Sequence, residues 1–311
     1  MSDVIVVGGG VSGLTTAVVL AERGHRVRVW SREPAGDTTS AVAGALWWPY
    51  RIEPLDRVGD WSLTTLRRYE ELAARPEETG VRLVDGLHGG ERLSGLGPWA
   101  GELKDAVETA EGLRCRLPLI DMPVHLKWLE GRVRAAGGAV ERRTVSSFAE
   151  AAAEAAAEAG TVVNCAGLGA RELVPDPGMR PVRGQLVLVE NPGIREWFTE
   201  ADPASSETTY FFPQPGRLVL GGTAAADDWS TVPDPRTAEE IVARCARVRP
   251  EIAGARVIGH RVGLRPARDA GVRIEAGPLP GGGRLVHNYG HGGAGVTVAL
   301  GCALEAARLV G

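Results

Sequence analysis

The strongest constraint on the fold lies at the start of the chain, where a glycine-rich turn joins two apolar runs. Residues 4–7 read Val-Ile-Val-Val and residues 8–13 read Gly-Gly-Gly-Val-Ser-Gly. In a dinucleotide fingerprint the first glycine makes the turn, the second admits the pyrophosphate and the third lets the helix pack on the strand. Gly8, Gly10 and Gly13 fill these positions, which predicts a strand, a phosphate-binding turn and a helix. The alternative is that the glycines serve packing alone.

A second strand completes this unit. Gly24 ends the predicted helix, and residues 26–30 alternate as expected for a strand parallel to the first. An NAD-type fingerprint places an acidic residue at the end of this strand to bind the ribose hydroxyls. Here Glu33 can reach a ribose and Arg32 can hold a phosphate or adenylate. The alternative is a pair of solvated turn charges.

Residues 38–50 combine small hydroxyl side chains, small apolar side chains and large aromatic ones. Thr38, Thr39 and Ser40 open the segment, and Trp47 and Trp48 lie near its end. The segment is too irregular for an ordinary core helix. Its hydroxyls and accessible backbone suit contact with phosphate or flavin, and the two tryptophans suit the wall of a ligand cavity.

The remaining pattern indicates two structural parts. We expect helices at residues 62–75, 123–136, 148–159 and 238–248, and strands at 139–142, 144–145, 161–167 (ending in a glycine turn), 185–189, 208–212, 218–220 and 256–264. The expected fold class is α/β, because strands and helices alternate in the nucleotide-binding part. The antiparallel strands beside it indicate a second, inserted domain. We expect a Rossmann-like nucleotide-binding domain from residues 1–58, 137–182 and 281–311, and an α+β substrate-binding domain built on an antiparallel sheet from residues 59–136 and 183–280.

Charge and composition exclude several classes of partner. The 311 residues carry a formal net charge of −4, the pI is near 5.9, and Lys and Arg are scattered among Asp and Glu. Without a basic patch we expect no nucleic-acid partner. No apolar stretch is expected to reach the roughly 20 residues of a membrane span, and no charged leader precedes the first strand. We therefore expect no membrane association and a cytoplasmic protein, with a homodimer left open.

Cysteine and histidine give no sign of a metal or redox site. Four widely separated cysteines form no C-x-x-C pair and are expected to be reduced core residues: Cys115, Cys165, Cys245 and Cys302. His287 and His291 have the spacing of a helical ligand pair, but the glycines between and after them break any helix. We expect no metal.

Two side chains in the second half are candidates for substrate contact. Arg265 follows an apolar run, and we expect Pro266 to end the strand there. A buried guanidinium needs an anion, which is either a structural partner or a substrate carboxylate. Tyr210 alternates with Thr208 and Phe212 on one face, a pattern that by itself favours a core tyrosine over a site residue.

The C-terminal segment supplies a second glycine-rich loop. Residues 286–297 contain four glycines and open into an apolar, alanine-rich helix. Such a loop points backbone N–H groups at a ligand. The chain has no serine elbow, H-E-x-x-H motif, P-loop lysine or evident acid/base dyad. A bound cofactor is therefore expected to carry the difficult chemical step.

Several of these segments match one known family. The most specific is His287-Asn288-Tyr289-Gly290-His291-Gly292-Gly293-x-Gly295-x-Thr297. Further matches are the turn at residues 8–13, Leu46-Trp47-x-Pro49-Tyr50, Asn164-Cys165-x-Gly167, Arg183-Gly184-Gln185, Tyr210 and Gly263-x-Arg265-Pro266. Over essentially the whole chain, they resemble the D-amino-acid oxidase family of FAD-dependent enzymes.

The resemblance implies roles for individual residues. Arg265 would bind the substrate carboxylate, Tyr210 would hydrogen-bond it, the carbonyl of Gly293 would receive the amine, and Trp48 would form part of the pocket wall. No catalytic side-chain acid or base is implied. The implied FAD contacts are Gly8, Gly9, Gly10, Val11, Ser12, Gly13, Arg32, Glu33, Thr38, Thr39, Ser40, Gly44, Ala45, Leu46, Val145, Gly167, Gly292, Gly293, Gly295, Val296 and Thr297.

The resemblance also implies a reaction. Hydride transfer from the substrate Cα to flavin N5 would give an imino acid that hydrolyses to a 2-oxo acid and ammonia. Oxygen would reoxidise FAD and yield hydrogen peroxide. Residues 292–297 would lie along the flavin ring, where N–H groups and the following helix N-terminus stabilise negative charge.

The sequence departs from vertebrate-type members at the pocket. Ser206 replaces a second active-site tyrosine, and Trp48 replaces a polar residue, so we expect a more open pocket with a larger apolar wall. Residues 198–209 and 223–226 contain no Arg or Lys to bind a second substrate carboxylate. Neutral, preferably apolar D-amino acids are the expected substrates. The alternatives are a glycine or sarcosine-type amine oxidase, and a flavin-binding protein without oxidase turnover.

Overall fold

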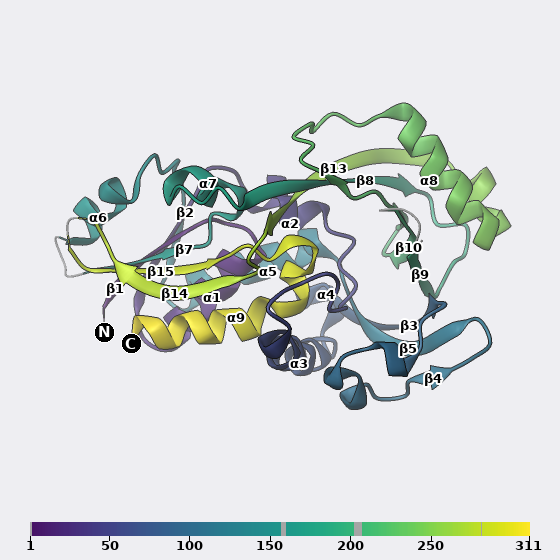
Figure 1. Ribbon diagram of the computed structural model, residues 1–311, viewed down its shortest axis with the longest axis horizontal. Helices are drawn as coiled ribbons and strands as arrows, with labels where there is room; N and C mark the ends of the chain where they lie inside the picture. The colour runs from purple at the N-terminus through teal and green to yellow at the C-terminus, as the bar shows by residue number, and fades with distance from the viewer. Residues whose placement is uncertain (1, 157–159, 202–206, 281) are drawn as a thin grey trace.

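The computed structural model describes residues 2–156, 160–201, 207–280 and 282–311. Within them, a six-stranded sheet lies at one end of the elongated molecule, next to both chain termini (Figure 1). Its strand order is β14-β15-β7-β1-β2-β6. The strands are β1 (Asp3–Val7), β2 (Arg26–Ser31), β6 (Ala139–Arg142), β7 (Thr161–Asn164), β14 (Arg273–Pro278) and β15 (Arg284–Tyr289). Only β14 runs antiparallel to its neighbour.

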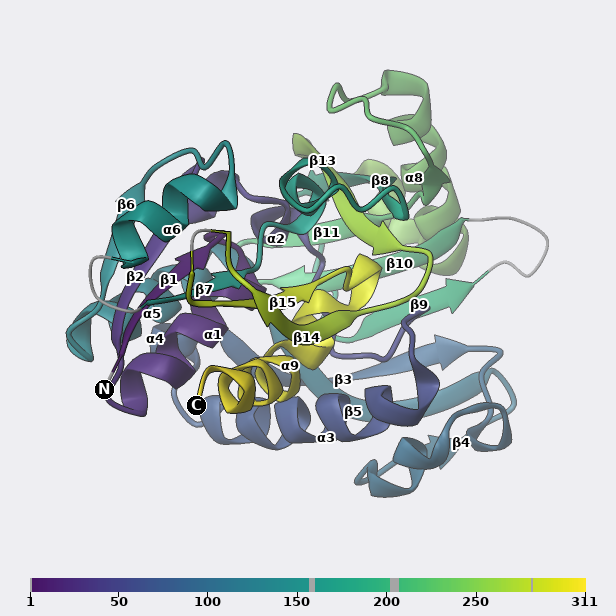
Figure 2. The same ribbon diagram turned by 60° about the vertical axis from the view of Figure 1, so that its left-hand side comes forward.

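Strand β1 is covered on both faces. Successive side chains of a strand point to opposite faces, and here they join different apolar clusters. Val4 packs with α1 (Val11–Glu22) and α9 (Gly295–Val310), whereas Ile5 packs with α6 (Phe148–Ala156) (Figure 2). A strand buried on both faces reads as a continuous apolar run, which explains the valine-rich N-terminus.

A second sheet contains nine strands in the described residues, and only the β3–β9 pair is parallel. Its order is β12-β8-β11-β10-β9-β3-β5-β4, with β13 on the other side of β8. The strands are β3 (Val81–Gly89), β4 (Val107–Glu108), β5 (Gly112–Ile120), β8 (Met179–Val189), β9 (Trp197–Ala201), β10 (Thr208–Gln214), β11 (Arg217–Gly221), β12 (Ala225–Ala226) and β13 (Val257–Arg268). Helix α8 (Pro235–Val248) packs against β8, β10 and β11.

Strands β8 and β13 connect the two parts of the molecule. They pair antiparallel from Met179 opposite Arg268 to Val189 opposite Val257. In Figure 1 they run from the region of α7 (Ala170–Leu173), beside the six-stranded sheet, to α8. The two ends of this strand pair therefore lie beside different parts of the molecule.

Helix α9 corrects an expectation about apolar segments. Residues Gly292–Val310 are long and apolar enough to cross a membrane by length and composition, although no such stretch was expected. In the structure 61% of this apolar window is buried. Helix α9 packs between α1 and α3 (Leu55–Leu72), which accounts for its apolar composition.

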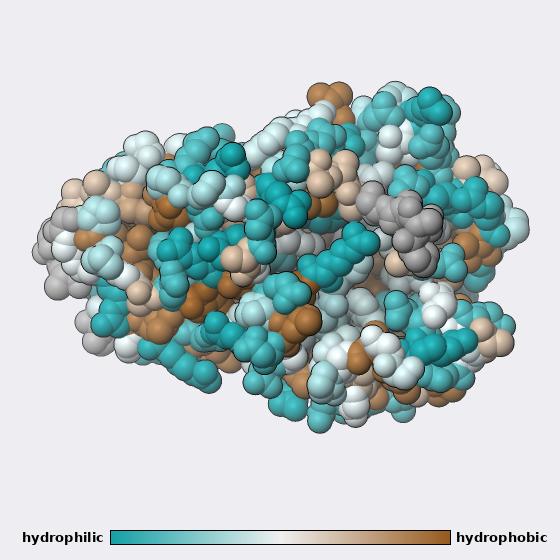
Figure 3. Space-filling view, in the orientation of Figure 1, coloured by the Kyte–Doolittle hydropathy of each residue, from teal (hydrophilic) through white to brown (hydrophobic). Residues whose placement is uncertain are grey.

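Charged and polar side chains cover most of the molecular face seen in Figure 3.

The expected domain boundaries need three corrections. Strand β14 was assigned to the substrate-binding part, but it pairs with β15 as a hairpin and lies in the six-stranded sheet. Strand β8 begins at Met179 and belongs to the nine-stranded sheet, ahead of the expected boundary after residue 182. Helix α5 (Met122–Ala135), also assigned to the substrate-binding part, packs on α1 and β6. The rest of the division stays a prediction.

Local expectations also differ in places. Strand β6 ends at Arg142, so residues 144–145 form no strand. Pro266 does not end β13, because it lies on an edge strand opposite Pro181, where neither residue needs an N–H for the ladder. Helix α3 begins at Leu55, ahead of residue 62, and α8 begins at Pro235, ahead of residue 238. The helix expected to residue 159 is described to Ala156 only.

Candidate active site

One cavity of about 900 Å³ is lined by residues of both sheets. It brings together the N-terminal glycine turn, the segment at residues 38–46 and the C-terminal glycine loop. Every residue predicted to contact FAD or substrate lines this cavity, with the exception of Gly13. Segments at opposite ends of the chain therefore form one site.

The N-terminal turn has no room for side chains. Gly8 has φ +120°, and a Cβ there would lie 2.3 Å from the carbonyl oxygen of Cys165. A Cβ at Gly13 would lie 1.9 Å from the carbonyl oxygen of Gly8. Gly13 therefore serves the packing of helix on turn, and its contact with FAD stays a prediction. No acidic residue lies in the first turn of α1, so the helix N-terminus favours an anion. A pyrophosphate fits this turn.

Hydroxyl groups of the segment at residues 38–46 tie the cavity walls together. The N–H of Val11 donates to Ser40 Oγ at 3.0 Å, and Thr39 Oγ1 donates to the carbonyl of Leu264 at 3.3 Å. Ala45 has φ 60°, a left-handed conformation that is uncommon outside glycine. The segment thus connects the start of α1 with the substrate strand β13.

The end of β2 carries charges at the cavity edge. Arg32 and Glu33 line the cavity and pair with each other at 2.8 Å, and the Arg32 side chain is 71% exposed. Both alternatives for this pair, ribose or phosphate contact and a solvated turn, agree with that arrangement. Arg143 also lines this end, with its guanidinium 3.8 Å from the centre of the Trp30 ring. Sequence reasoning missed Arg143, because it meets β2 only through the pairing of β2 with β6.

Buried polar contacts fix the C-terminal glycine loop to α1. His291 Nε2 bonds Asn288 Oδ1 at 3.0 Å, and Asn288 Nδ2 donates to Thr16 Oγ1 at 3.0 Å. Burial lowers the pKa of His291 to about 4, so the ring is neutral. In the part of the chain that the structure describes, no three His, Cys, Asp or Glu residues gather as metal ligands. The two histidines of the C-terminal glycine loop, His287 and His291, therefore act in packing and hydrogen bonding.

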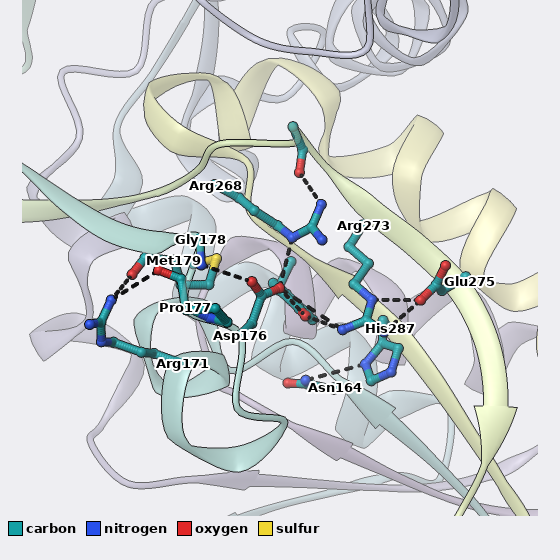
Figure 4. A network of polar contacts seen from close by, with 12 residues as sticks. Asn164, Arg171, Asp176, Pro177, Gly178, Met179, Arg268, Arg273, Glu275 and His287 are labelled. Carbon is teal, nitrogen blue, oxygen red and sulfur yellow. Dashed lines mark hydrogen bonds and ion pairs between the residues drawn. The ribbon is translucent and has the colours of Figure 1, made fainter.

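A second polar network joins that loop to β13 (Figure 4). Asp176 is 8% exposed and accepts hydrogen bonds from Arg268 Nε at 2.7 Å and from the Tyr289 hydroxyl at 2.8 Å. Arg273 Nη1 donates to the same hydroxyl at 2.7 Å. Burial opposes ionisation of Asp176, but the bonds from Arg268 and Tyr289 outweigh it and hold the pKa of its carboxyl below the usual value. The network anchors β13, which carries Arg265.

The residues predicted to bind substrate lie together. A Cβ on Gly293 would be 3.4 Å from Arg265 Cδ and 3.5 Å from Tyr50 Cδ1. Arg265 Nη1 donates to the carbonyl of Thr223 at 2.9 Å, and among the described residues no carboxylate lies within 4.0 Å of its guanidinium. Burial raises the pKa of the Tyr210 hydroxyl, and Arg265 acts in the opposite direction. Tyr210 is therefore a protonated hydroxyl beside an uncompensated cation.

An aromatic wall, to which Trp48 and His88 contribute, lines the same cavity. The Trp48 and His88 ring centres are 3.7 Å apart, and Trp48 meets Trp99 edge-on at 4.9 Å. His88 is 2% exposed, its Nδ1 bonds Thr199 Oγ1, and burial lowers its pKa to about 3. The wall is uncharged. Sequence reasoning found Trp48 but missed His88 and Thr199, because β3 and β9 meet only in the folded sheet. Ser206 lies outside the described residues.

The fold and the cavity define the class of FAD-dependent oxidoreductases. A glycine turn that fits a pyrophosphate and a second glycine loop open on a cavity with an uncharged wall and an arginine, Arg265, that has no carboxylate partner among the described residues. The family model described as "FAD dependent oxidoreductase" matches residues 3–309. The structure of L-alpha-glycerophosphate oxidase from Mycoplasma pneumoniae with FAD bound is similar in fold, with a TM-score of 0.80 at 16% identity, covering 100% of this chain and 95% of that chain.

Curated relatives narrow the class to a family. The chain is 64% identical to a D-amino-acid oxidase of Streptomyces coelicolor, over 99% of this chain and 96% of the relative. It is 47% identical to a D-amino-acid oxidase of Rubrobacter xylanophilus, over 99% of this chain and 95% of the relative. The chain belongs to the D-amino-acid oxidase family of FAD-dependent oxidoreductases, and its cofactor is FAD.

Proposed function

We propose that this enzyme oxidises neutral D-amino acids to 2-oxo acids and ammonia, with oxygen reduced to hydrogen peroxide. One amino acid, one oxygen and one water would give one of each product. The observation that carries the proposal is Arg265, a cavity-facing guanidinium without a carboxylate partner among the described residues, beside Gly293 and Tyr210. A substrate carboxylate supplies the missing anion.

The residues of the chain hold the substrate by its α-substituents. Arg265 binds the carboxylate, and the protonated Tyr210 hydroxyl adds a hydrogen bond to it. The carbonyl of Gly293 accepts a hydrogen bond from the amine. FAD, when bound, supplies the acceptor for the hydride that leaves Cα. Residues 292–297 would hold its ring, and the N-terminus of α9 favours negative charge there.

The uncharged cavity wall favours substrates whose side chains are neutral. Of the described residues that line the cavity, Arg32, Arg143 and Arg265 are cationic, and the first two lie at the β2–β6 end. The buried histidines His88 and His291 are neutral at pH 7 because burial lowers their pKa values to about 3 and about 4. A second substrate carboxylate, as in D-aspartate, would find no further cation near Arg265 among the described residues that line the cavity.

A substrate panel tests the proposal. Peroxide formation is measured with D-alanine, D-methionine and D-valine, with their L-forms, and with D-aspartate, glycine and sarcosine. We expect turnover of the three neutral D-amino acids above all other compounds. Faster turnover of glycine or sarcosine would favour an amine oxidase of that type. If the protein purifies with flavin, and no D-amino acid bleaches that flavin without oxygen, the oxidase proposal fails.

A further inference from the structure

The motif Arg183-Gly184-Gln185 lies on β8 directly beside the proposed carboxylate ligand. A Cβ on Gly184 would be 2.5 Å from Arg265 Nη2 and 2.6 Å from its Cζ. Real side chains do not approach so closely, so the guanidinium can take this position against β8 only because residue 184 is glycine. The backbone of β8 therefore forms the surface on which Arg265 rests.

Thr223 connects that surface to Arg265. The backbone N–H of Gln185, a residue that is 0% exposed, donates to Thr223 Oγ1 at 3.0 Å. The carbonyl of Thr223 accepts from Arg265 Nη1 at 2.9 Å. Thr223 thus bonds β8 through its side chain and orients the Arg265 guanidinium through its backbone carbonyl.

Thr223 also lies beside the second proposed substrate ligand. It follows Gly221 and Gly222, whose added Cβ atoms would be 2.1 Å and 2.8 Å from ring atoms of Tyr210. Tyr210 is therefore pressed against the backbone that leads into Thr223. Displacement of this backbone would move the contacts of both Tyr210 and Arg265.

The segment after Thr223 is held on β8 as well. Arg183 Nε donates to the carbonyl of Ser230 at 2.9 Å, and its Nη2 donates to the carbonyl of Val232 at 2.6 Å. The Gln185 side chain bonds both the N–H and the carbonyl of Asp234, at 2.8 Å and 2.7 Å. The Arg183 side chain is only 7% exposed. Partly buried bonds to β8 thus restrain this segment at its far end, and Thr223 restrains it at the near end.

We propose that Thr223 is a positioning residue, whose hydroxyl holds its own carbonyl where it orients Arg265 toward the substrate carboxylate. This inference rests on the proposed function, because it assigns the carboxylate to Arg265. No carboxylate of the described residues orients that guanidinium, so neutral acceptors must do so. Thr223 supplies the acceptor that the structure records for Nη1.

The test compares Thr223→Val with Thr223→Ser in the FAD-loaded enzyme. Valine keeps the shape but leaves the buried N–H of Gln185 without an acceptor, whereas serine keeps the hydroxyl. The probe is butanoate, a carboxylate without an amine, whose dissociation constant is measured by calorimetry and as an inhibition constant. We expect Thr223→Val to weaken butanoate and raise KM for D-alanine by about tenfold each, with kcat within about twofold. Thr223→Ser should restore both constants.

Thr109→Val is the matched control, because it also removes a threonine hydroxyl bond, here to the carbonyl of Gly112 between β4 and β5. It should leave both constants unchanged. The inference is overturned if Thr223→Val binds butanoate within twofold of the unaltered enzyme, or if serine and valine weaken binding equally. If Thr223→Val does not fold, Thr223→Ala against Thr223→Ser makes the same comparison.

A double variant separates positioning from general damage. In the Arg265→Ala background, Thr223→Val should cause no further loss of butanoate affinity, because the residue on which Thr223 acts is gone. Additive losses would overturn the inference. Failure of the proposed function looks different: the unaltered enzyme would bind butanoate but form no peroxide from any D-amino acid.

Discussion

At the residue scale, Arg265 is the side chain on which the proposed chemistry most depends. Replacing it with alanine should leave the FAD cavity intact, because the glycine turn and the segment at residues 38–46 make no use of it. The substrate carboxylate would lose its charged partner, so kcat/KM for D-alanine should fall by about a hundredfold or more. Steady-state kinetics on enzyme of measured flavin content checks this.

Arg261→Ala is the matched control for that prediction. Arg261 lies four residues earlier on β13, is exposed, and donates to the carbonyl of its neighbour His260. This variant should keep the kcat/KM of the unaltered enzyme. Comparable activity of Arg265→Ala would show that the carboxylate binds elsewhere.

Residues found from the sequence differ from those missed in how they meet their partners. Gly8 and Gly293 belong to continuous motifs, so their spacing and composition predicted a place on the cavity. His88 meets Trp48, Arg143 meets Trp30, and Thr223 meets Arg265 only through contacts between distant segments. No local pattern marks such residues. Gly13 belongs to the same motif as Gly8, but it packs the helix on the turn and does not line the cavity.

At the scale of elements, α3 and α9 cross at a point that admits no side chain. A Cβ on Gly301 would lie 2.3 Å from Trp61 Cα and 2.5 Å from the Trp61 carbonyl oxygen. Backbone atoms cannot yield as a flexible side chain can, so Gly301→Ala should force the helices apart. We expect a loss of about 1–3 kcal/mol in the free energy of unfolding, measured by urea denaturation.

Gly131→Ala gives the opposite expectation for the same substitution. Gly131 lies within α5, and nothing approaches its Cβ position within 4 Å. Alanine there removes the entropic cost of a helical glycine, so stability should rise by about 0.5–1 kcal/mol. Equal changes in stability for Gly131→Ala and Gly301→Ala would show that the close contact of α3 with α9 does not require glycine.

Elements with strong internal patterns were found where expected, and errors fell where pairing decides. The buried strand β1 and the helix that follows carry their signal in consecutive residues. Strand β14 was placed in the wrong sheet, because its hairpin partner β15 determines where it pairs. Pro266 misled because a proline ends an inner strand but is tolerated on an edge. The neighbour of a strand is a property of the assembled sheet.

At the scale of the whole molecule, buried histidines should make the fold sensitive to acid. Burial lowers the pKa of His88 to about 3 and those of His125, His287 and His291 to about 4. The unfolded chain binds these protons near pH 6.5, so stability is present above that pH and is lost as pH falls toward the folded values. Each histidine lowers the free energy of unfolding by up to about 1.4 kcal/mol for each pH unit of acidification in this window.

His125→Gln tests this dependence away from the cavity. His125 Nδ1 bonds the carbonyl of Thr79 at 2.8 Å, and glutamine can donate a similar bond. Thermal unfolding midpoints are measured between pH 7.5 and pH 5 for both proteins. The unfolding midpoint should fall less with acid in the variant, because one buried histidine fewer takes up a proton on unfolding. Parallel declines would mean that His125 is protonated in the folded protein.

Strand β13 has a mechanical consequence. Arg265 and Arg268 are three residues apart on this strand, a separation of about 10 Å that its extended backbone fixes. Arg268 is anchored through Asp176 to Tyr289, four residues before Gly293. If the nine-stranded sheet tilts relative to the six-stranded one, β13 carries both arginines with it at unchanged spacing. The bonds of Asp176 to Arg268 and Tyr289 would resist such tilting, and they thereby help to keep the distance between the carboxylate ligand and the amine acceptor constant.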